Sequence, residues 1–453
     1  MDQSPDKSTA LMTAWWYRNY VLAVLFLSYA VNVMDRSSVL AVSLQAIKAE
    51  FGASDTQLGL LTGIAFAVFF STMGIPIAAL ADRSSRRNVL AISIAVWSAM
   101  TALCGTAVNF TMLFATRVGT AIGEAGGSPP SHSLISDYFP KSERGRAFAI
   151  FALGVPFGTA LGSFVAGQAV QAYGWRTTFM LVGLPGLLVA TLVFLTVKEP
   201  PRGLSDHAGP LRQTGPAPGL FEVLTTLWHR PSFRQLCFAS ALHAVAWYGS
   251  SAFNAAFLIR SHQMTAATAA NWLTLFAAIG GLGTLLGGYL ADRLSVRTND
   301  KRWYLWVPGI ATMAMVPFQF IAYLSGGLTL ALQSFAAMTF LAAAFFGPSI
   351  TMTQALATLR MRSVASSVLL FVQTMIGYGL GPLVAGHLSD QLAPAYGIQS
   401  LGYALAALGI VNVWAAVHYL LGTRTLKADL AHAEEQCQGG AVTTSAALTP
   451  VKA

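Results

Sequence analysis

Runs of about 20 apolar residues recur along the whole chain, and this is the length that carries an α-helix across a membrane. Hydrophobic residues fill 55% of the 453 positions and charged residues only 10%, against roughly 25% charged residues in ordinary soluble domains. A soluble chain of this composition could not cover its surface with polar groups. The sequence therefore predicts an all-α membrane protein. Its twelve transmembrane helices are expected near residues 19–46, 57–80, 88–107, 110–135, 145–170, 175–197, 232–260, 267–291, 304–324, 328–356, 364–389 and 397–421.

The placement of lysine and arginine predicts how these helices are oriented. With the amino terminus in the cytoplasm, 22 of the 27 basic residues lie on the cytoplasmic side, three lie outside and two lie inside spans. Both termini are then cytoplasmic, and we expect an integral membrane protein. The net charge of +9 follows from these short basic loops, so we expect no nucleic-acid partner.

A stretch rich in proline and glycine divides the twelve spans into two halves. It reads "KEPPRGLSDHAGPLRQTGPAPGL" and lies between the sixth and seventh spans. We expect an amino-terminal six-helix half at residues 1–198, a cytoplasmic linker at 199–230 and a carboxy-terminal six-helix half at 231–422. The segment 423–453 is polar and rich in small residues, has no apolar period, and is predicted to be a disordered cytoplasmic tail.

Two loops repeat each other in corresponding places of the two halves. "ALADRSSRR" (79–87) follows the second span and "YLADRLSVR" (289–297) follows the eighth, so that Asp82 and Asp292 are 210 residues apart. Duplicated halves of this kind are common in transporters that hold their substrate between the halves, near the middle of the membrane.

The second of these loops resembles the signature of the major facilitator superfamily, Gly-x-x-x-Asp-Arg/Lys-x-Gly-Arg/Lys-Arg/Lys. The first copy departs from that pattern at Ala78 and Ser85, where the signature has glycine. The resemblance extends over residues 19–422 and implies the major facilitator fold. It also implies a cytoplasmic latch that stabilises the outward-facing state, with a plain topology anchor as the alternative role for Arg86 and Arg87. The latch residues are Asp82, Arg83, Arg86, Arg87, Asp292 and Arg293.

Four charged residues interrupt the apolar spans. Asp35 and Arg36 lie in "AVNVMDRSSVLAV" (30–42) of the first span, and Arg117 and Glu124 lie in the fourth. The latter two are seven residues apart, so they share one helix face about 10 Å apart. An ionisable residue at membrane depth costs several kcal/mol unless it is paired or hydrated, so each is a functional candidate. Asp35 and Glu124 are predicted to carry a coupling proton, with a buried ion pair that only fixes helix packing as the alternative.

The fourth-span stretch "RVGTAIGEAGGSPPSHSLISDYFPKSERGRA" (117–147), together with "NVMDRSSV" in the first span, resembles the Spinster branch of the superfamily. That resemblance implies proton-driven transport, by alternating access, of lysophospholipids or similar single-chain amphiphiles. The alternatives are a proton-coupled symporter of sugar acids or other organic anions, and a hydrophobic-drug/proton antiporter. Candidate substrate-binding residues are Arg36, Arg117, Asn254 and Gln373.

Motifs for other functions are missing from the sequence. A phosphate-binding loop would need the dipeptide Gly-Lys, which does not occur, and no His-x-x-His or Gly-x-Ser-x-Gly motif is present. The three cysteines are far apart and share no metal-ligand spacing. We therefore expect no enzyme, no catalytic residues, no metal and no cofactor. The expected partners are protons, a small amphiphile and membrane lipid, and the expected state is a monomer.

Overall fold

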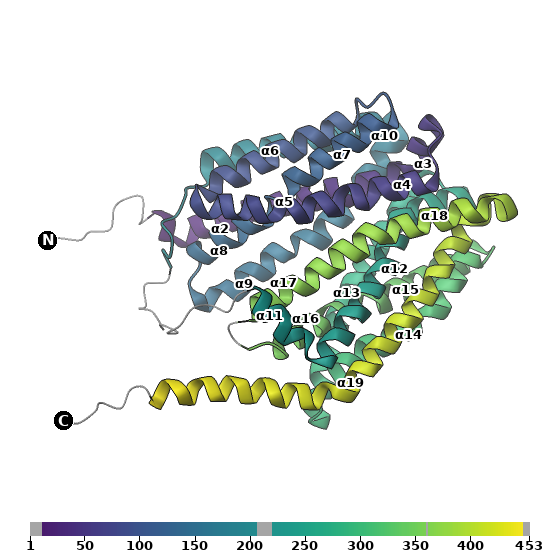
Figure 1. Ribbon diagram of the computed structural model, residues 1–453. Helices are drawn as coiled ribbons and strands as arrows, with labels where there is room; N and C mark the ends of the chain where they lie inside the picture. Colours follow the sequence, from purple (N-terminus) through teal and green to yellow (C-terminus); the bar gives the residue numbers. More distant parts are fainter. Residues whose placement is uncertain (1–10, 206–219, 359–360, 447–453) are drawn as a thin grey trace, which may run out of the picture. The chain divides into compact units, whose positions relative to one another are not determined.

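The computed structural model describes residues 11–205, 220–358 and 361–446, and all regular secondary structure in these residues is helical (Figure 1). The first elements are α2 (Trp15–Val33), the π-helical turn η1 (Met34–Ser38), α3 (Val39–Phe51), α4 (Asp55–Thr62), α5 (Ile64–Arg83), α6 (Arg86–Cys104), α7 (Phe110–Glu124), α8 (Ser128–Tyr138), α9 (Lys141–Ala152) and α10 (Gly154–Thr196). They are followed by α11 (Leu220–Trp228), α12 (Pro231–His262), α13 (Ala266–Thr298), α14 (Trp303–Leu324), α15 (Leu328–Ala343) and α16 (Phe346–Ala355). The last are α17 (Arg362–Val372), the π-helical turn η2 (Gln373–Tyr378), α18 (Gly379–Tyr396), the short 3-10 turn η3 (Gly397–Gln399) and α19 (Ser400–Ala446).

These helices have the length and surface of a membrane protein. Within the described residues, seven helical stretches are long and apolar enough to cross a membrane. Large apolar side chains project from them, among them Ile75, Leu188 and Leu285, which are 74%, 74% and 72% exposed. Lipid tails can cover such side chains at no cost, whereas water cannot. The predicted all-α membrane fold is confirmed.

Local sequence explains where the long helices break. The 43 residues of α10 would extend about 65 Å if straight, roughly twice the hydrocarbon thickness. The helix bends at Gly174, whose φ of 77° is left-handed and therefore favours glycine. Between α3 and α4 the chain turns and restarts at Ser54, which forms a capping box with Gln57.

Close packing fixes α10 against α2 and η1. A Cβ atom added at Gly158 would lie 2.3 Å from the carbonyl oxygen of Ala30, and one added at Gly162 would lie 2.7 Å from the Cγ atom of Met34. Only glycine permits this approach, as at other small-residue helix contacts in membranes. The contact therefore sets the position of η1, the turn that carries Asp35 and Arg36.

The chain forms two compact units. Of the described residues, unit 1 contains 11–205, 251–278 and 382–401, and unit 2 contains 220–250, 279–358, 361–381 and 402–446. Each has its own hydrophobic core. The core of unit 1 includes Val21, Trp97 and Tyr138, and that of unit 2 includes Phe233 and Tyr419.

The segment after residue 422 differs from the prediction. The sequence predicts a disordered tail at 423–453, but α19 continues as a helix to Ala446, and residues 447–453 lie outside the described part of the chain. The prediction missed an apolar period: Leu426, Leu430 and Ala433 follow a helical spacing and are 0%, 7% and 3% exposed. The first two of these join the core of unit 2.

The predicted linker at 199–230 also contains ordered structure. Helix α11 occupies its last part, where Val223 and Leu227 are fully buried. Residues 206–219 of the linker lie outside the described residues.

Candidate functional site

Unit 1 brings together the four charged residues that interrupt the predicted spans. We call Asp35, Arg36, Arg117 and Glu124 the charged cluster. Asp35 and Arg36 lie in η1, Arg117 lies in the middle of α7, and Glu124 is the last residue of α7. Asp35 and Arg117 are completely buried, and Glu124 is 1% exposed.

The π-helical turn provides acceptors for Arg117. In a π turn the backbone leaves the regular i→i+4 hydrogen-bond pattern, so carbonyl oxygens become available to other donors. The Arg117 guanidinium donates to the carbonyl oxygen of Arg36 at 3.0 Å and reaches that of Asp35 at 3.4 Å. Arg117 is thus held by the backbone of η1, and its charge lies next to the side chains that η1 carries.

Arg36 joins η1 to the end of α7. Its Nε atom donates to Glu124 Oε2 at 2.8 Å, and its Nη2 atom donates to Asn32 Oδ1 at 2.7 Å. The guanidinium carbon lies 5.0 Å from the ring centre of Phe66 and 4.9 Å from that of Phe70, close enough for cation–π attraction. The side chain of Arg36 is 23% exposed while that of Glu124 is 0% exposed, so Arg36 is the accessible member of this ion pair.

Asp35 has unused hydrogen-bonding capacity. Neither of its carboxyl oxygens has a hydrogen-bond partner among the described residues, and the same holds for Glu124 Oε1 and Arg117 Nε. Asp35 is nevertheless near enough to Glu124 and Arg117 to interact with both electrostatically. A carboxyl group that is buried without a hydrogen bond is expensive as an anion and much cheaper as a neutral acid. The cluster can therefore hold a proton.

The first copy of the repeated loop is organised around Arg86. This side chain is 1% exposed and pairs with Asp137 and with Glu199, at 2.8 Å for the latter. It also donates to Ser133 Oγ at 3.0 Å and to the carbonyl oxygen of Pro200 at 2.7 Å. The loop between α5 and α6 is thereby attached to α8 and to the segment after α10.

Glu199 is held in its charged form by this arrangement. Burial alone would raise its pKa, but hydrogen bonds from the Arg87 backbone N–H and the Arg86 guanidinium outweigh burial, and the pKa of Glu199 falls below its ordinary value. Asp82 and Arg83 are exposed, in contrast. The contact to Asp82 is through its backbone carbonyl, which accepts from Arg202 at 2.6 Å. Arg87 is half-buried, and its guanidinium lies 5.2 Å from the ring centre of Phe194.

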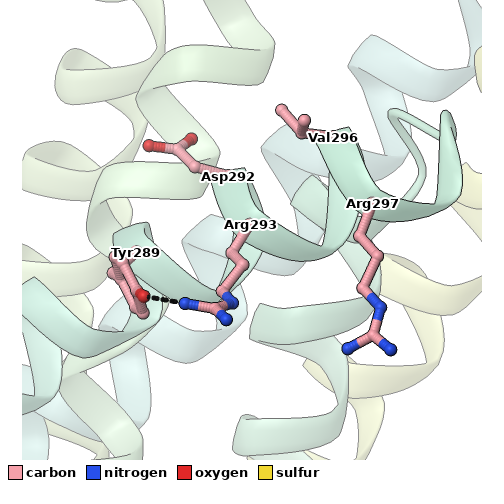
Figure 2. A pocket seen from close by; sticks show the side chains of 5 residues that line it. All are labelled: Tyr289, Asp292, Arg293, Val296 and Arg297. Carbon is pink, nitrogen blue, oxygen red and sulfur yellow. Dashed lines mark hydrogen bonds between the residues drawn. The ribbon is translucent and has the colours of Figure 1, made fainter.

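The second copy of the loop makes different contacts. Asp292 accepts a hydrogen bond from the Tyr304 hydroxyl at 2.6 Å, and Arg293 donates to the Tyr289 hydroxyl at 2.5 Å. Figure 2 shows that the Asp292 carboxylate and the Arg293 guanidinium point apart. With Val296 and Arg297 these residues line a surface pocket of about 480 Å³ on α13. The two loops therefore repeat in sequence but not in their contacts.

The other two candidate residues are not part of the charged cluster. Asn254 is half-buried on α12 and belongs to unit 1, whereas Gln373 begins η2 and belongs to unit 2. Gln373 is 6% exposed, and its Nε2 atom has no hydrogen-bond partner among the described residues.

Sequence reasoning missed an ion cluster around Asp55 at the start of α4. Asp55 accepts from Arg260 in a bidentate pair, both distances being 2.8 Å, and from Lys48 at 2.6 Å. Asp390 caps the same helix end, where it accepts from the backbone N–H groups of Asp55 and Thr56 at 2.9 and 2.7 Å. The one local signal in the sequence was the Ser54 capping box, which marks a helix start but does not identify the partners.

The described residues contain no group of three or more His, Cys, Asp or Glu side chains that could hold a metal ion. The charged cluster itself pairs two carboxylic acids with two guanidinium groups. Such a set can bind an anionic group or exchange a proton.

Comparisons with known proteins identify the family. The sequence profile of the Major Facilitator Superfamily matches residues 25–374 and 236–452. An MFS-type efflux pump of Mycolicibacterium smegmatis is 32% identical over 418 residues, which cover 90% of this chain and 93% of that protein. Protein spinster homolog 1 of Xenopus tropicalis is 28% identical over 468 residues, which cover 96% and 86% of the two chains.

A solved structure agrees with these relatives. A bacterial homolog of the human lysosomal transporter Spinster, in an inward-facing and unoccupied conformation, matches with a TM-score of 0.84 at 33% identity. The match covers 92% of this chain and 99% of that chain. The family predicted from the repeated loop, its fold and its Spinster-like character are confirmed. This chain belongs to the Major Facilitator Superfamily, as a secondary transporter similar to the Spinster proteins.

Proposed function

We propose that the chain couples the movement of protons to the movement of a lysophospholipid or a similar single-chain amphiphile, by alternating access. One observation carries this proposal: the buried Asp35 carboxyl group has no hydrogen-bond partner among the described residues and lies beside the Arg36–Glu124 ion pair. Similarity to Spinster proteins supports the substrate class. The proposed setting is a bacterial inner membrane, which the similarity to a bacterial Spinster homolog supports. Both termini are proposed to lie in the cytoplasm, which the distribution of basic residues supports.

Proton binding follows from competition between two carboxyl groups for the same positive charges. Arg36 is bonded to Glu124, which stabilises the Glu124 anion, while Asp35 is left without a hydrogen bond, so that the neutral acid is its less costly form. When the cluster gains access to water, Asp35 can release its proton, because hydration then stabilises the anion. Asp35 and Glu124 are accordingly the proposed proton-coupling residues.

Substrate binding can be linked to the proton through Arg36. This guanidinium is the accessible member of the cluster, and a phosphate group binds guanidinium well. A headgroup phosphate at Arg36 would compete with Glu124 for its donors. Glu124 would then be buried without its partner and would take up a proton, since a buried unpaired carboxylate is costly.

The surroundings of Arg36 suit an amphiphile. The rings of Phe66 and Phe70 stack on each other, and both lie next to the guanidinium, so charge and apolar surface lie side by side. In unit 2, taken by itself, helices α14, α15 and α16 carry no Asp, Glu, Lys or Arg, and such apolar surface suits an acyl chain. Arg117 is, with Arg36, a candidate polar contact for the headgroup. Asn254 and Gln373 stay candidate substrate-binding residues, and their hydrogen-bonding side chains would suit the sugar-acid alternative.

The conformational latch belongs to the same proposal. Its proposed members are Asp82, Arg83, Arg86, Arg87, Asp292 and Arg293. Arg86 is the best supported of them, because it is buried and joins three segments of unit 1. The exposure of Asp82 and Arg83 is compatible with contacts that form in another conformation.

Efflux of hydrophobic drugs is a second candidate, because the efflux pump of Mycolicibacterium smegmatis is 32% identical over 90% of the chain.

A transport assay separates the candidates. Purified protein in liposomes is offered labelled lysophospholipid, a labelled sugar acid and a labelled hydrophobic drug, each with and without an imposed pH gradient. We expect the gradient to drive lysophospholipid. Gradient-driven movement of the drug or the sugar acid, with none of the lysophospholipid, would refute the proposed substrate.

A further inference from the structure

A chain of hydrogen bonds runs through the interior of unit 2 and ends on a backbone carbonyl group at each side. His243 Nε2 lies 3.1 Å from the carbonyl oxygen of Ala342, and His243 Nδ1 lies 2.9 Å from Asn412 Oδ1. Asn412 Nδ2 donates to Gln319 Oε1 at 2.9 Å, and Gln319 Nε2 donates to the carbonyl oxygen of Leu405 at 2.9 Å. The three side chains are at most 1% exposed. We call this chain the His243 network.

The direction of every bond in the His243 network is fixed from its ends, because a backbone carbonyl group can only accept. The carbonyl of Leu405 requires the amide NH₂ of Gln319, and this leaves the Gln319 oxygen facing Asn412. Asn412 must then turn its NH₂ to Gln319 and its oxygen to the histidine ring. Exchanging nitrogen and oxygen in either amide would set two acceptors face to face, so the result does not depend on how the amides are assigned.

Both ring nitrogens of His243 therefore face acceptors. A neutral imidazole has one N–H donor and one acceptor nitrogen, so it can satisfy only one of the two contacts. An imidazolium donates from both nitrogens. We infer that His243 is a proton-binding site and that the His243 network closes only when the ring carries its second proton.

Two opposing effects act on this proton. Burying an unpaired cation costs several kcal/mol. In the other direction, both hydrogen bonds of the imidazolium are charge-assisted, and the Phe345 ring centre lies 4.4 Å from that of His243, within cation–π range. In a neutral ring, one of the two nitrogens carries no hydrogen and faces a buried oxygen that can only accept. This unsatisfied contact costs about 1–3 kcal/mol. The hydrogen bonds and the ring contact offset part of the cost of burial, so the proton can be gained and lost.

The charges around the network do not decide its protonation. Within the described residues, α14, α15 and α16 have no charged side chain. The nearest charged side chains along α12 and α19 are Arg234, Arg260 and Arg424. The nearest other titratable groups of these helices are Cys237, Tyr248, Tyr323, His418 and Tyr419. No carboxylate among them offsets the imidazolium, so proton binding at His243 adds a net charge to an apolar interior.

Nitrogen NMR of isotope-labelled histidine measures this directly in the full-length protein in lipid nanodiscs. At about pH 6, near the ordinary pKa of histidine, we expect both ring nitrogens of His243 to carry hydrogen. The resonances are assigned by their loss in His243→Gln or, if that variant does not fold, by single replacement of the other histidines. A His243 ring with one bare nitrogen at about pH 6 would overturn the inference. The measurement involves no transport, so its outcome is independent of the proposed function.

A variant that does not touch the ring tests the polarity argument. Gln319→Leu frees Asn412 to turn its NH₂ toward His243, and a neutral ring can then satisfy both of its contacts. We expect His243 in Gln319→Leu to lose its second proton at about pH 6. Asn412→Leu removes the acceptor itself and serves if Gln319→Leu does not fold.

The matched control is Thr312→Val, which lies seven residues before Gln319 on the same helix. Thr312 is 1% exposed, and its hydroxyl has no partner in the described part of the chain. The control should keep the imidazolium, and an imidazolium in Gln319→Leu or its loss in the control would contradict the network.

Discussion

Arg36 and Glu124 are 88 residues apart in sequence, and the Nε atom of Arg36 lies 2.8 Å from Oε2 of Glu124. This bond joins the π-helical turn of the first predicted span to the end of α7 in the fourth. The completely buried Asp35 is the residue before Arg36. The ion pair and the unpartnered acid together are the chemical basis of the proposed coupling.

Removing either carboxyl group should uncouple transport from the proton gradient. Glu124→Gln and Asp35→Asn keep the shape of each side chain but cannot exchange a proton. We expect normal membrane insertion. The pH-driven component of uptake should fall by roughly 5- to 150-fold, the factor that corresponds to a usual coupling free energy of about 1–3 kcal/mol. The measurement is uptake into proteoliposomes with and without a pH gradient. Glu143→Gln, at a carboxylate whose side chain is 49% exposed, is the control. A wild-type response to the gradient in both cluster variants would exclude this assignment.

Replacing Arg36 by lysine should weaken substrate binding while leaving the positive charge in place. The guanidinium donates at once to Glu124 and Asn32 and lies about 5 Å from the rings of Phe66 and Phe70, a combination that a lysine ammonium cannot reproduce. We expect the substrate KM to rise about tenfold, equivalent to about 1.4 kcal/mol. Initial rates over a range of substrate concentrations give this value. An unchanged KM would mean that Arg36 serves helix packing alone.

The Arg86 network should make stability depend on pH. Glu199 has a lowered pKa in the folded protein, so its contribution to stability is present above its unfolded pKa of about 4.3 and is lost as pH falls through the lower folded value. We expect the thermal midpoint to fall on acidification in the wild type. Glu199→Gln should have a lower midpoint at neutral pH and a weaker dependence on acid.

The control for that experiment is Glu222→Gln, which changes an exposed carboxylate of α11. Its profile should follow the wild type. Parallel acid profiles for the wild type and Glu199→Gln would show that Glu199 does not contribute in this way.

The Asp55 cluster should stabilise the start of α4. Asp55 and Arg260 have side chains that are 3% and 10% exposed, and breaking a buried pair of this kind costs about 3–5 kcal/mol. Asp55→Asn should therefore lower the thermal midpoint much more than Glu50→Gln, whose pair with Arg176 is far more exposed. Equal midpoints for the two variants would show that the Asp55 pair is energetically neutral.

How far sequence predicts this protein depends on the distance between partners along the chain. Some features can be recognised within a short stretch of sequence. These are the apolar spans, the loop motif and the seven-residue spacing of Arg117 and Glu124, and they predict the helices and the candidate residues. The partners of Arg86 and Asp55 could not be predicted in this way. Glu199 is 113 residues from Arg86, and Arg260 is 205 residues from Asp55, so only the folded chain pairs them.

Two further features required coordinates for different reasons. Asp35 and Arg36 interrupt a span visibly, but nothing in their sequence indicates the π-helical turn that directs backbone carbonyls to Arg117. His243 was one isolated histidine in an apolar helix, and its significance depends on the orientation of two amides on other helices.

The most direct test of the central claim follows protons and lipid in one experiment. Proteoliposomes that enclose a pH-sensitive dye receive lysophospholipid without an imposed gradient, and dye response and lipid uptake are recorded together. We predict that lysophospholipid drives a proton flux in the wild type and that Glu124→Gln abolishes this flux. Lipid uptake by the wild type with no accompanying change in internal pH would contradict the account.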